Sequence, residues 1–199
     1  MEKPAVTKFR IHAHLNNRWS PRSFVDKPVA KEVLQRIAEA ARWSPSAYNE
    51  QPWRFLIGVK GDTTWGKIFE TLVEFNQNWA KRAPVLILCV GSKNFSANGV
   101  HNDVFAYDVG QSAAHITFQA MEEGLRAHQM SGFDHSKAAK VFDIPDDFQP
   151  LSVIALGYQG NPDLLDDGLR GAETSPRARK EFKDLFFKES FGKASPLFE

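Results

Sequence analysis

The chain has 199 residues, of which 42% are hydrophobic and 25% charged, and its formal net charge is +1. This length and balance predict a single globular domain, residues 1–199, that buries a core without disulfide support. The near-neutral charge predicts no general attraction to nucleic acid or to a membrane surface, so any phosphate site must be a local cluster of Arg and Lys. The one cysteine, Cys89, excludes an internal disulfide and a multi-cysteine metal centre, and its apolar surroundings predict a buried strand position.

Targeting and metal signals are absent from the pattern. The N-terminal residues contain no apolar segment, so we expect no signal peptide, and no apolar run approaches the ~20 residues of a membrane span. The six histidines have no metal-ligand spacing. We therefore expect a cytoplasmic protein without a metal site.

Helix and strand signals alternate in the first half of the chain. An apolar stripe predicts a first helix that Asp26 caps, with Pro28 in its first turn, and that ends near Ser44. A polar loop separates this helix from the next elements, which are a strand, a helix and a second strand at 53–59, 64–80 and 85–90. The second strand is almost wholly apolar, which predicts cover on both of its faces.

The longest predicted helix, residues 103–123, opens the second half after a loop at 92–102. Gly124 is expected to terminate it, and its Asp103 and Asp108 are interpreted as surface or interface charges. The elements expected after it are a strand, a turn, a helix and a strand at 126–130, 131–133, 135–142 and 151–157. A polar loop is expected at 161–176 and an amphipathic segment at 179–189, before a tail.

The order of elements leaves two fold classes open. Alternation of helices and strands allows a doubly wound parallel sheet. However, the chain opens with a helix, and no glycine-rich dinucleotide fingerprint follows a strand. We therefore favour an α+β fold with helices around a modest four-stranded sheet.

Two segments rich in arginine are candidates for phosphate binding. The first places Arg18 and Arg22 on either side of Ser20, and the second holds Arg177 and Arg179. Guanidinium forks match phosphate geometry, and a serine hydroxyl adds a donor. Each segment alone is also typical of an exposed basic turn.

Two further segments are candidates for contact with a planar heterocycle. The loop at 45–53 holds Asn49 and Gln51, whose carboxamides match the donors and acceptors along the edge of a pyrimidine or flavin ring. In the turn Ser131-Gly132, the glycine lets main-chain N–H groups approach a ligand closely. Taken alone, each segment is more often ordinary loop or turn chemistry.

Taken together, these segments resemble the nitroreductase family. Its R-x-S-x-[RK]-x-F motif stands here as Arg18, Ser20, Arg22 and Phe24, and its S-x-x-N-x-Q-P-W loop as Ser46, Asn49, Gln51, Pro52 and Trp53. The later family motifs follow in order as Ala83-Pro84, Gly124-Leu125, Gly132-Phe133-Asp134, Leu156-Gly157-Tyr158, and Arg177 with Arg179. The resemblance covers residues 16–185.

The resemblance implies a fold, a cofactor and an activity. The fold would be α+β, with a central, mostly antiparallel sheet flanked by helices, in an intertwined homodimer with FMN at the interface. The protein would pass electrons from NAD(P)H through flavin N5 to nitroaromatics, quinones or similar electrophiles. FMN would carry the chemistry, so no catalytic side chain is expected.

The resemblance also assigns roles to residues. Arg18 and Ser20 would hold the FMN phosphate, and Arg177 and Arg179 would close on it. Arg22 would lie by N1 and O2 of the ring and Asn49 on its pyrimidine edge, while the N–H groups of Ser131 and Gly132 would reach N5 and O4. Ser46 and its neighbours would come from the partner subunit. The full predicted set is Arg18, Trp19, Ser20, Arg22, Pro45, Ser46, Asn49, Gln51, Met130, Ser131, Gly132, Arg177 and Arg179.

The pocket for the flavin ring is expected to have aromatic walls, and this sequence departs from the family pattern at two places near it. Trp19, Tyr48 and Trp53 are candidates for its apolar walls. Met130-Ser131 stands where the family often has Pro or Glu before the glycine. Tyr48 stands where smaller or more polar residues are common, and is expected to narrow the pocket.

Two alternatives to the nitroreductase activity stay open. One is a protein that stores or senses FMN without turnover, and the other is a family member with a different flavin reaction, such as dehalogenation or flavin cleavage. The sequence does not choose between NADH and NADPH, and it does not name the acceptor.

Overall fold

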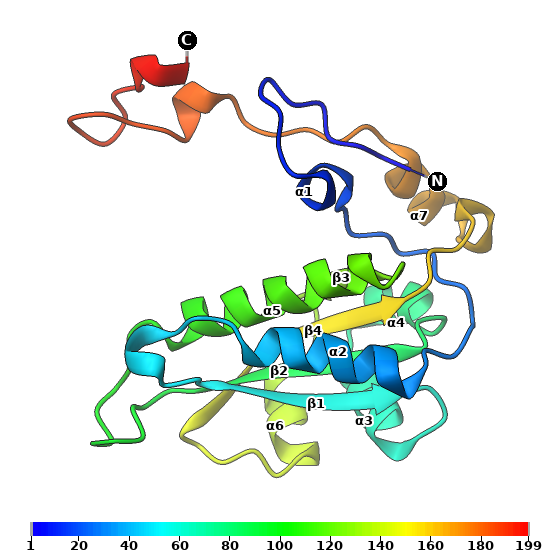
Figure 1. The fold of residues 1–199 in the computed structure, drawn as a ribbon. Coiled ribbons are helices and arrows are strands. Elements are labelled where there is room, and N and C mark those ends of the chain that lie inside the picture. The colour runs from blue at the N-terminus through cyan, green and yellow to red at the C-terminus, as the bar shows by residue number, and fades with distance from the viewer. Residues whose placement is uncertain (1, 199) are drawn as a thin grey trace.

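A four-stranded antiparallel sheet forms the centre of the computed structural model, which describes residues 2–198 (Figure 1). Its order is β1-β2-β4-β3, and every pairing is antiparallel. The strands are β1 Trp53–Val59, β2 Val85–Ser92, β3 Arg126–Met130 and β4 Phe148–Gly157. The predicted α+β class and the four strands are confirmed, and the parallel alternative is wrong.

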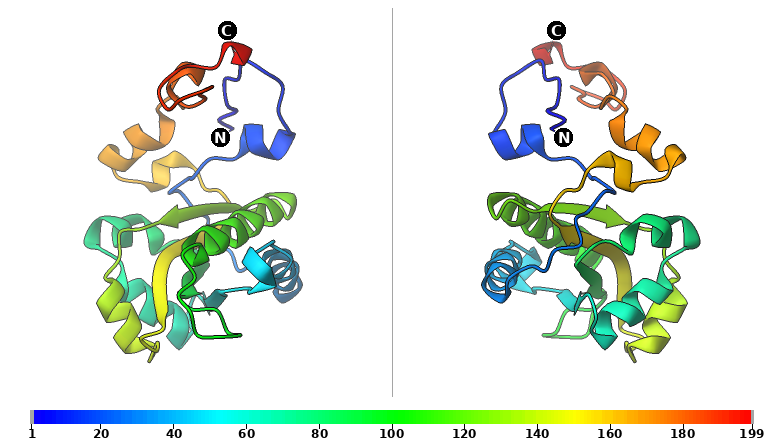
Figure 2. Two further views of the ribbon diagram at one scale, coloured as in Figure 1. Left: turned by 90° about the vertical axis from the view of Figure 1, so that its left-hand side faces the viewer. Right: turned by 90° about the vertical axis from the view of Figure 1, so that its right-hand side faces the viewer.

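Two layers of helices cover the two faces of the sheet (Figure 2). One layer contains α2 Lys31–Arg42 and α5 Phe105–Glu122, and the other contains α3 Thr63–Thr71, α4 Glu74–Ala80 and α6 His135–Val141. The side chains of β2 alternate between the layers, as the pleat of a strand requires. Ile87 packs in the core beneath α2 and α5, and Leu88 packs in the core beneath α3, α4 and α6.

Burial of β2 on both faces confirms the interpretation of its apolar run. Residues 85–91 are all buried. Cys89 is among them, and burial raises the pKa of its thiol to about 12. The thiolate is the reactive form, so this cysteine is a packing residue.

The long helix α5 ends as the sequence predicts. Gly124 has a φ of +74°, in the left-handed region that glycine adopts without strain. Its N–H donates to the Met121 carbonyl at 3.0 Å, and the N–H of Leu125 donates to the Ala120 carbonyl at 2.8 Å. These two bonds form a Schellman cap.

Three expectations about helices are wrong, each for a tertiary reason. The helix expected at 64–80 is divided, because Leu72 is extended and bridges to Phe133. The first long helix begins at Lys31, and Asp26 does not cap it but pairs with Lys60 at 2.6 Å. Asp108 is not a surface charge, since it is only 2% exposed.

The two ends of the chain lie side by side, outside the two helical layers (Figures 1 and 2). The short helix α1 Ala13–Asn17 precedes the arginine motif, and α7 Asp167–Thr174 lies where a loop was expected at 161–176. The amphipathic segment expected at 179–189 contains only a 3-10 turn, Phe182–Asp184. Within the described residues, no helix combines the length and apolar character needed to cross a membrane.

Candidate functional site

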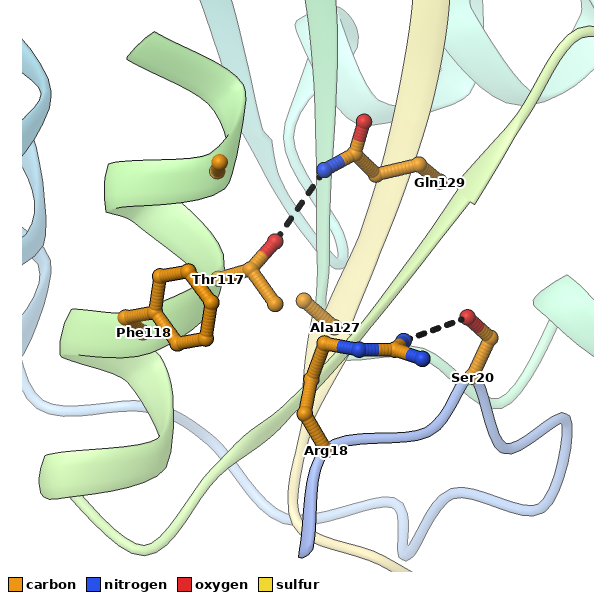
Figure 3. Close-up of a pocket in the computed structure, with 7 residues that line it drawn as sticks. Arg18, Ser20, Thr117, Phe118, Ala127 and Gln129 are labelled. Atoms are coloured by element: carbon orange, nitrogen blue, oxygen red, sulfur yellow. Dashed lines mark hydrogen bonds between the residues drawn. The ribbon is translucent and has the colours of Figure 1, made fainter. Parts of the chain in front are cut away.

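Arg18 and Ser20 line a cavity of about 190 Å³ between α5 and β3 (Figure 3). The N-terminal segment brings these two residues to β3, the strand at one edge of the sheet. A guanidinium N–H of Arg18 donates to Ser20 Oγ at 3.3 Å. The remaining walls are formed by Ala114, Thr117, Phe118, Ala127 and Gln129. The cavity therefore has one cationic wall and one wall with small polar and apolar groups.

The two arginine segments predicted from the sequence come together. Arg18, Arg177 and Arg179 line one further cavity of about 230 Å³. Burial lowers the pKa of Arg18, and the charges of Arg177 and Arg179 lower it further. Burial and Arg179 likewise lower the pKa of Arg177. We call Arg18, Ser20, Arg177 and Arg179 the arginine cluster.

Within residues 2–198, no carboxylate forms an ion pair with the arginine cluster. Among the ion pairs formed by residues 2–198, none involves its three guanidinium groups. Arg177 donates instead to the main-chain oxygens of Lys3 at 2.6 Å and Asn16 at 2.8 Å, and so ties down the N-terminal segment. Like charges held together without an acid favour an anionic ligand, and guanidinium groups with a hydroxyl suit phosphate.

Arg22 and Trp19 flank this cluster and are more enclosed. The N–H of Arg22 donates to both oxygens of the Glu173 carboxylate at 3.0 Å. The Nε of Arg22 is buried and has no hydrogen-bond partner within the described chain. The indole of Trp19 is buried, with the Lys3 ammonium 4.5 Å from its centroid, so it is not an open wall.

His128 supports the arginine motif from β3. Its Nδ1 lies 3.0 Å from the Pro21 carbonyl oxygen, and its ring lies 4.5 Å from that of Trp79, centroid to centroid. Burial lowers the pKa of His128 to about 4, and the nearby charges of Arg22 and Arg18 act in the same direction. The imidazole is therefore neutral near pH 7.

The turn after β3 presents main-chain donors. Met130 is buried in the core, whereas Ser131 is exposed. The Gly132 carbonyl accepts from Val73 N–H at 3.1 Å and from Asn76 Nδ2 at 2.9 Å, which fixes the turn. A Cβ on Gly132 would lie 2.5 Å from Asn76 Nδ2, so a larger residue would displace the Asn76 amide that fixes the turn. Within residues 2–198, the N–H groups of Ser131 and Gly132 donate to no protein acceptor.

The loop at 45–51, which we call the carboxamide loop, has a fixed and strained shape. Tyr48, Asn49 and Gln51 have φ values of +52°, +56° and +53°, which non-glycine residues adopt at a cost. The Gln51 N–H donates to Ser46 Oγ at 3.0 Å, and the Gln51 side chain donates to the Asn49 carbonyl at 3.0 Å. Such strain persists only where surrounding contacts determine the conformation.

The carboxamide loop is anchored far along α5 from the arginine cluster. The N–H of Ala47 donates to the buried Asp108 carboxylate at 3.0 Å, near the start of α5. The Arg18 cavity instead involves Thr117 and Phe118. At ~1.5 Å per residue, these two anchor points on α5 are roughly 14 Å apart. One chain therefore does not bring Asn49 and Gln51 to the arginine cluster.

Of the aromatic wall candidates, only Tyr48 is open. It is 93% exposed, and its ring meets that of Phe95 edge to face at 5.8 Å. Both rings line a hollow of about 650 Å³ with Asn49 and Gln51. Trp53 is packed in the core beneath α2 and α5, so its assignment as a wall is wrong.

Four residues at the site carry no site assignment from the sequence: Thr117, Gln129, Glu173 and Asp108. The side chain of Gln129 donates to Thr117 Oγ1 at 3.1 Å, and both line the Arg18 cavity (Figure 3). Side chains alternate along β3, so Gln129 lies on the same face as Ser131. This alternation is the sequence signal that could have identified Gln129 as a site residue.

Within residues 2–198, no group of three or more His, Cys, Asp or Glu side chains is arranged to hold a metal ion.

Comparison with known proteins connects this geometry to a family. A family model described as the nitroreductase family matches residues 15–64 and 59–158. A protein of Methanothermobacter thermautotrophicus with the provisional name NADH dehydrogenase/NAD(P)H nitroreductase is 30% identical over 170 residues, which are 81% of this chain and 85% of that protein. An uncharacterised 15.4 kDa protein of Mycolicibacterium smegmatis is 30% identical over 146 residues, which are 70% of this chain and 97% of that protein.

Two solved structures show the same fold. An oxidoreductase containing FMN is 32% identical, with a TM-score of 0.88 over 94% of this chain and 95% of that chain. A nitroreductase family protein from Streptococcus pneumoniae TIGR4 is 21% identical, with a TM-score of 0.68 over 86% of this chain and 96% of that chain.

Proposed function

Because this chain belongs to the nitroreductase family, we propose that it is an FMN-dependent oxidoreductase that works as a homodimer. It takes electrons from NAD(P)H and passes them to nitroaromatics, quinones or similar electrophilic small molecules. The observation that carries this proposal is the arginine cluster, in which guanidinium groups converge beside a cavity with no ion-paired carboxylate among the described residues.

The residues present fit FMN. Arg18, Ser20, Arg177 and Arg179 would hold its phosphate, whose nearly two negative charges compensate the converging cations. The oxidoreductase of 32% identity contains FMN, which supports the same cofactor here. When bound, FMN supplies the centre that accepts and donates hydride, so no side-chain nucleophile or general base is required.

Other residues would orient the ring and tune it. The free N–H groups of Ser131 and Gly132 would donate to the N5 and O4 edge. Arg22 would favour negative charge at N1 and O2, which stabilises the reduced ring relative to the oxidised one. Asn49 would meet the pyrimidine edge. Because Tyr48 lies beside Asn49, it would narrow the space for the acceptor.

The family resemblance supports the homodimer, because it implies that the partner subunit supplies Ser46 and its neighbours. Asn49 and Gln51 lie in the same loop, away from the arginine cluster of their own chain, so a second copy would supply the carboxamide loop. The C-terminal segment also exposes large apolar residues, which suit an interface with that copy. These are Leu185, Phe186, Phe191 and Leu197.

Anaerobic titration of the purified protein tests the proposal. We expect a yellow protein whose flavin absorbance is bleached by NADH or NADPH and returns when a nitroaromatic or a quinone is added. A colourless protein that does not take up FMN would contradict the cofactor assignment. A bound flavin that neither nicotinamide reduces would contradict the activity, and would indicate a protein that stores or senses FMN.

A further inference from the structure

Glu173, in the last turn of α7, is a buried acid with no assigned function. The residue is only 1% exposed. Its carboxylate accepts three main-chain hydrogen-bond contacts from two donors: the Arg22 N–H is shared between both oxygens at 3.0 Å, and the Ser23 N–H donates at 3.1 Å. Among the ion pairs of residues 2–198, none includes Glu173. Because burying a carboxylate is costly, these N–H donors offset its burial, and the charge of the nearby Lys3 ammonium contributes.

The same three hydrogen bonds fix the main chain of the arginine motif. On the other side, the Ser23 carbonyl accepts from the Gly160 N–H at 2.8 Å, and Ser23 Oγ donates to the Asn161 carbonyl at 2.5 Å. Hydrogen bonds on two sides therefore fix the main chain of Arg22 and Ser23. If this part of the main chain were mobile, Arg22 and the residues before it would shift relative to the sheet.

Glu173 also joins this motif to the segment that carries the C-terminal arginines. Its main-chain carbonyl accepts from the Lys3 ammonium at 2.6 Å, and the Lys3 carbonyl accepts from Arg177 at 2.6 Å. Arg177 and Arg179 follow α7 directly in the chain. Three segments that are distant in sequence thus meet at one residue, and two of them carry the cations of the arginine cluster.

We propose that Glu173 is a positioning residue that sets the segment from Arg18 to Arg22 against Arg177 and Arg179, so that their cations converge on one phosphate. This inference rests on the proposed FMN site and deepens it. A carboxylate near a phosphate opposes phosphate binding through space. Loss of its charge alone would therefore tighten FMN binding, whereas loss of its hydrogen bonds would weaken it. The sign of the effect separates the two roles.

Glu173→Gln is the direct test, because it keeps the shape but places an N–H donor against main-chain N–H groups. We expect the dissociation constant of the apoprotein for FMN to rise by roughly tenfold or more, as for the loss of a hydrogen bond to a charged group. The affinity for riboflavin, which lacks the phosphate, should change much less. Flavin fluorescence titration gives both constants. A structural defect alone would weaken both ligands equally.

Two further variants complete the test. Asp167→Asn removes the same charge from a side chain of α7 that is 97% exposed and pairs with Arg170, so FMN affinity should stay as in the wild type. Glu173→Asp keeps the charge but shortens the reach, so it should also weaken FMN selectively. If the Gln variant does not fold, the FMN and riboflavin affinities of the Asp variant test the inference instead.

Three outcomes would overturn the inference: FMN binding that is unchanged or tighter in Glu173→Gln, an equal loss of FMN and riboflavin affinity, or an Asp variant that binds FMN like the wild type. A wild-type protein that does not bind FMN would instead overturn the proposed function, which keeps the two failures distinguishable.

Discussion

The arginine cluster and the carboxamide loop differ in how a single chain presents them. The arginine cluster gathers residues from both ends of the chain, beside β3 and the middle of α5. The carboxamide loop is equally well fixed, by Asp108 and by its own hydrogen bonds, but at the start of α5. One chain therefore forms the phosphate end of the proposed site, whereas its residues for the ring end lie exposed and away from that phosphate end. In the proposed homodimer a second copy completes the site, and the predictions below test each side of this difference.

The largest effect is expected at the arginine cluster. Arg18→Ala should weaken FMN binding by roughly a hundredfold, because it removes a partly buried cation with charge-assisted hydrogen bonds. Fluorescence titration of the apoprotein measures the loss. Arg42→Ala is the matched control, since Arg42 is exposed and pairs with Glu39 on α2. Equal FMN affinity in both variants would contradict the phosphate assignment.

Acidic pH should lower the stability of the fold through protonation of His128, which supports the arginine motif. Its pKa is about 4 when folded against 6.5 as the ordinary value, so the unfolded chain binds an additional proton between these pH values. Stability is then fully present above pH 6.5 and falls as the pH drops toward 4, by up to about 3 kcal/mol.

The variant His128→Asn should flatten this dependence, because its amide can still donate to the Pro21 carbonyl but does not titrate. Thermal unfolding between pH 7 and pH 4 measures the change. A wild-type slope that the variant leaves intact would assign the acid sensitivity to other groups.

The carboxamide loop should show a smaller effect. Asn49→Gly with Gln51→Gly removes both carboxamides without strain, since glycine accepts the positive φ of each residue. We expect FMN binding to weaken by roughly tenfold, as for one or two lost hydrogen bonds. The same titration measures it. Unchanged affinity would mean that this loop does not touch the cofactor.

The smallest effect concerns the acceptor. Tyr48→Gly removes an exposed ring at a positive φ and should widen the acceptor space. We expect the KM for bulky quinones to fall by roughly threefold, less than for a change inside an enclosed pocket because Tyr48 is exposed, while the KM for small acceptors stays constant. Steady-state kinetics with quinones of increasing size test this. A parallel change for all sizes would place Tyr48 outside the acceptor space.

The sheet could be predicted from the sequence because its signals are local. The strand pattern identified β1 and β3 with the bounds that the structure has, and Gly124 identified the end of α5. The break at Leu72 could not be predicted, because its bridge to Phe133 comes from a distant segment. Helix α7 was missed because its sequence is polar with two glycines, and only docking buries Leu169 and Glu173.

The arginines of the site were found because their residue type and spacing already suit phosphate, and the structure brings Arg18, Arg177 and Arg179 together. Glu173 and Asp108 were missed for the opposite reason. Acidic residues in polar stretches usually face solvent, and only tertiary contacts show that these two carboxylates are buried and hold main-chain N–H groups.

Mixing two defective variants tests most directly whether two subunits share each flavin site. Arg18→Ala lacks the phosphate end, and Asn49→Gly with Gln51→Gly lacks the ring end. After joint unfolding and refolding in equal amounts, half of the dimers are mixed, and each carries one intact site. Tight FMN binding should therefore return to about a quarter of the wild-type sites. A mixture that binds no better than the average of its two components would contradict a site shared between subunits.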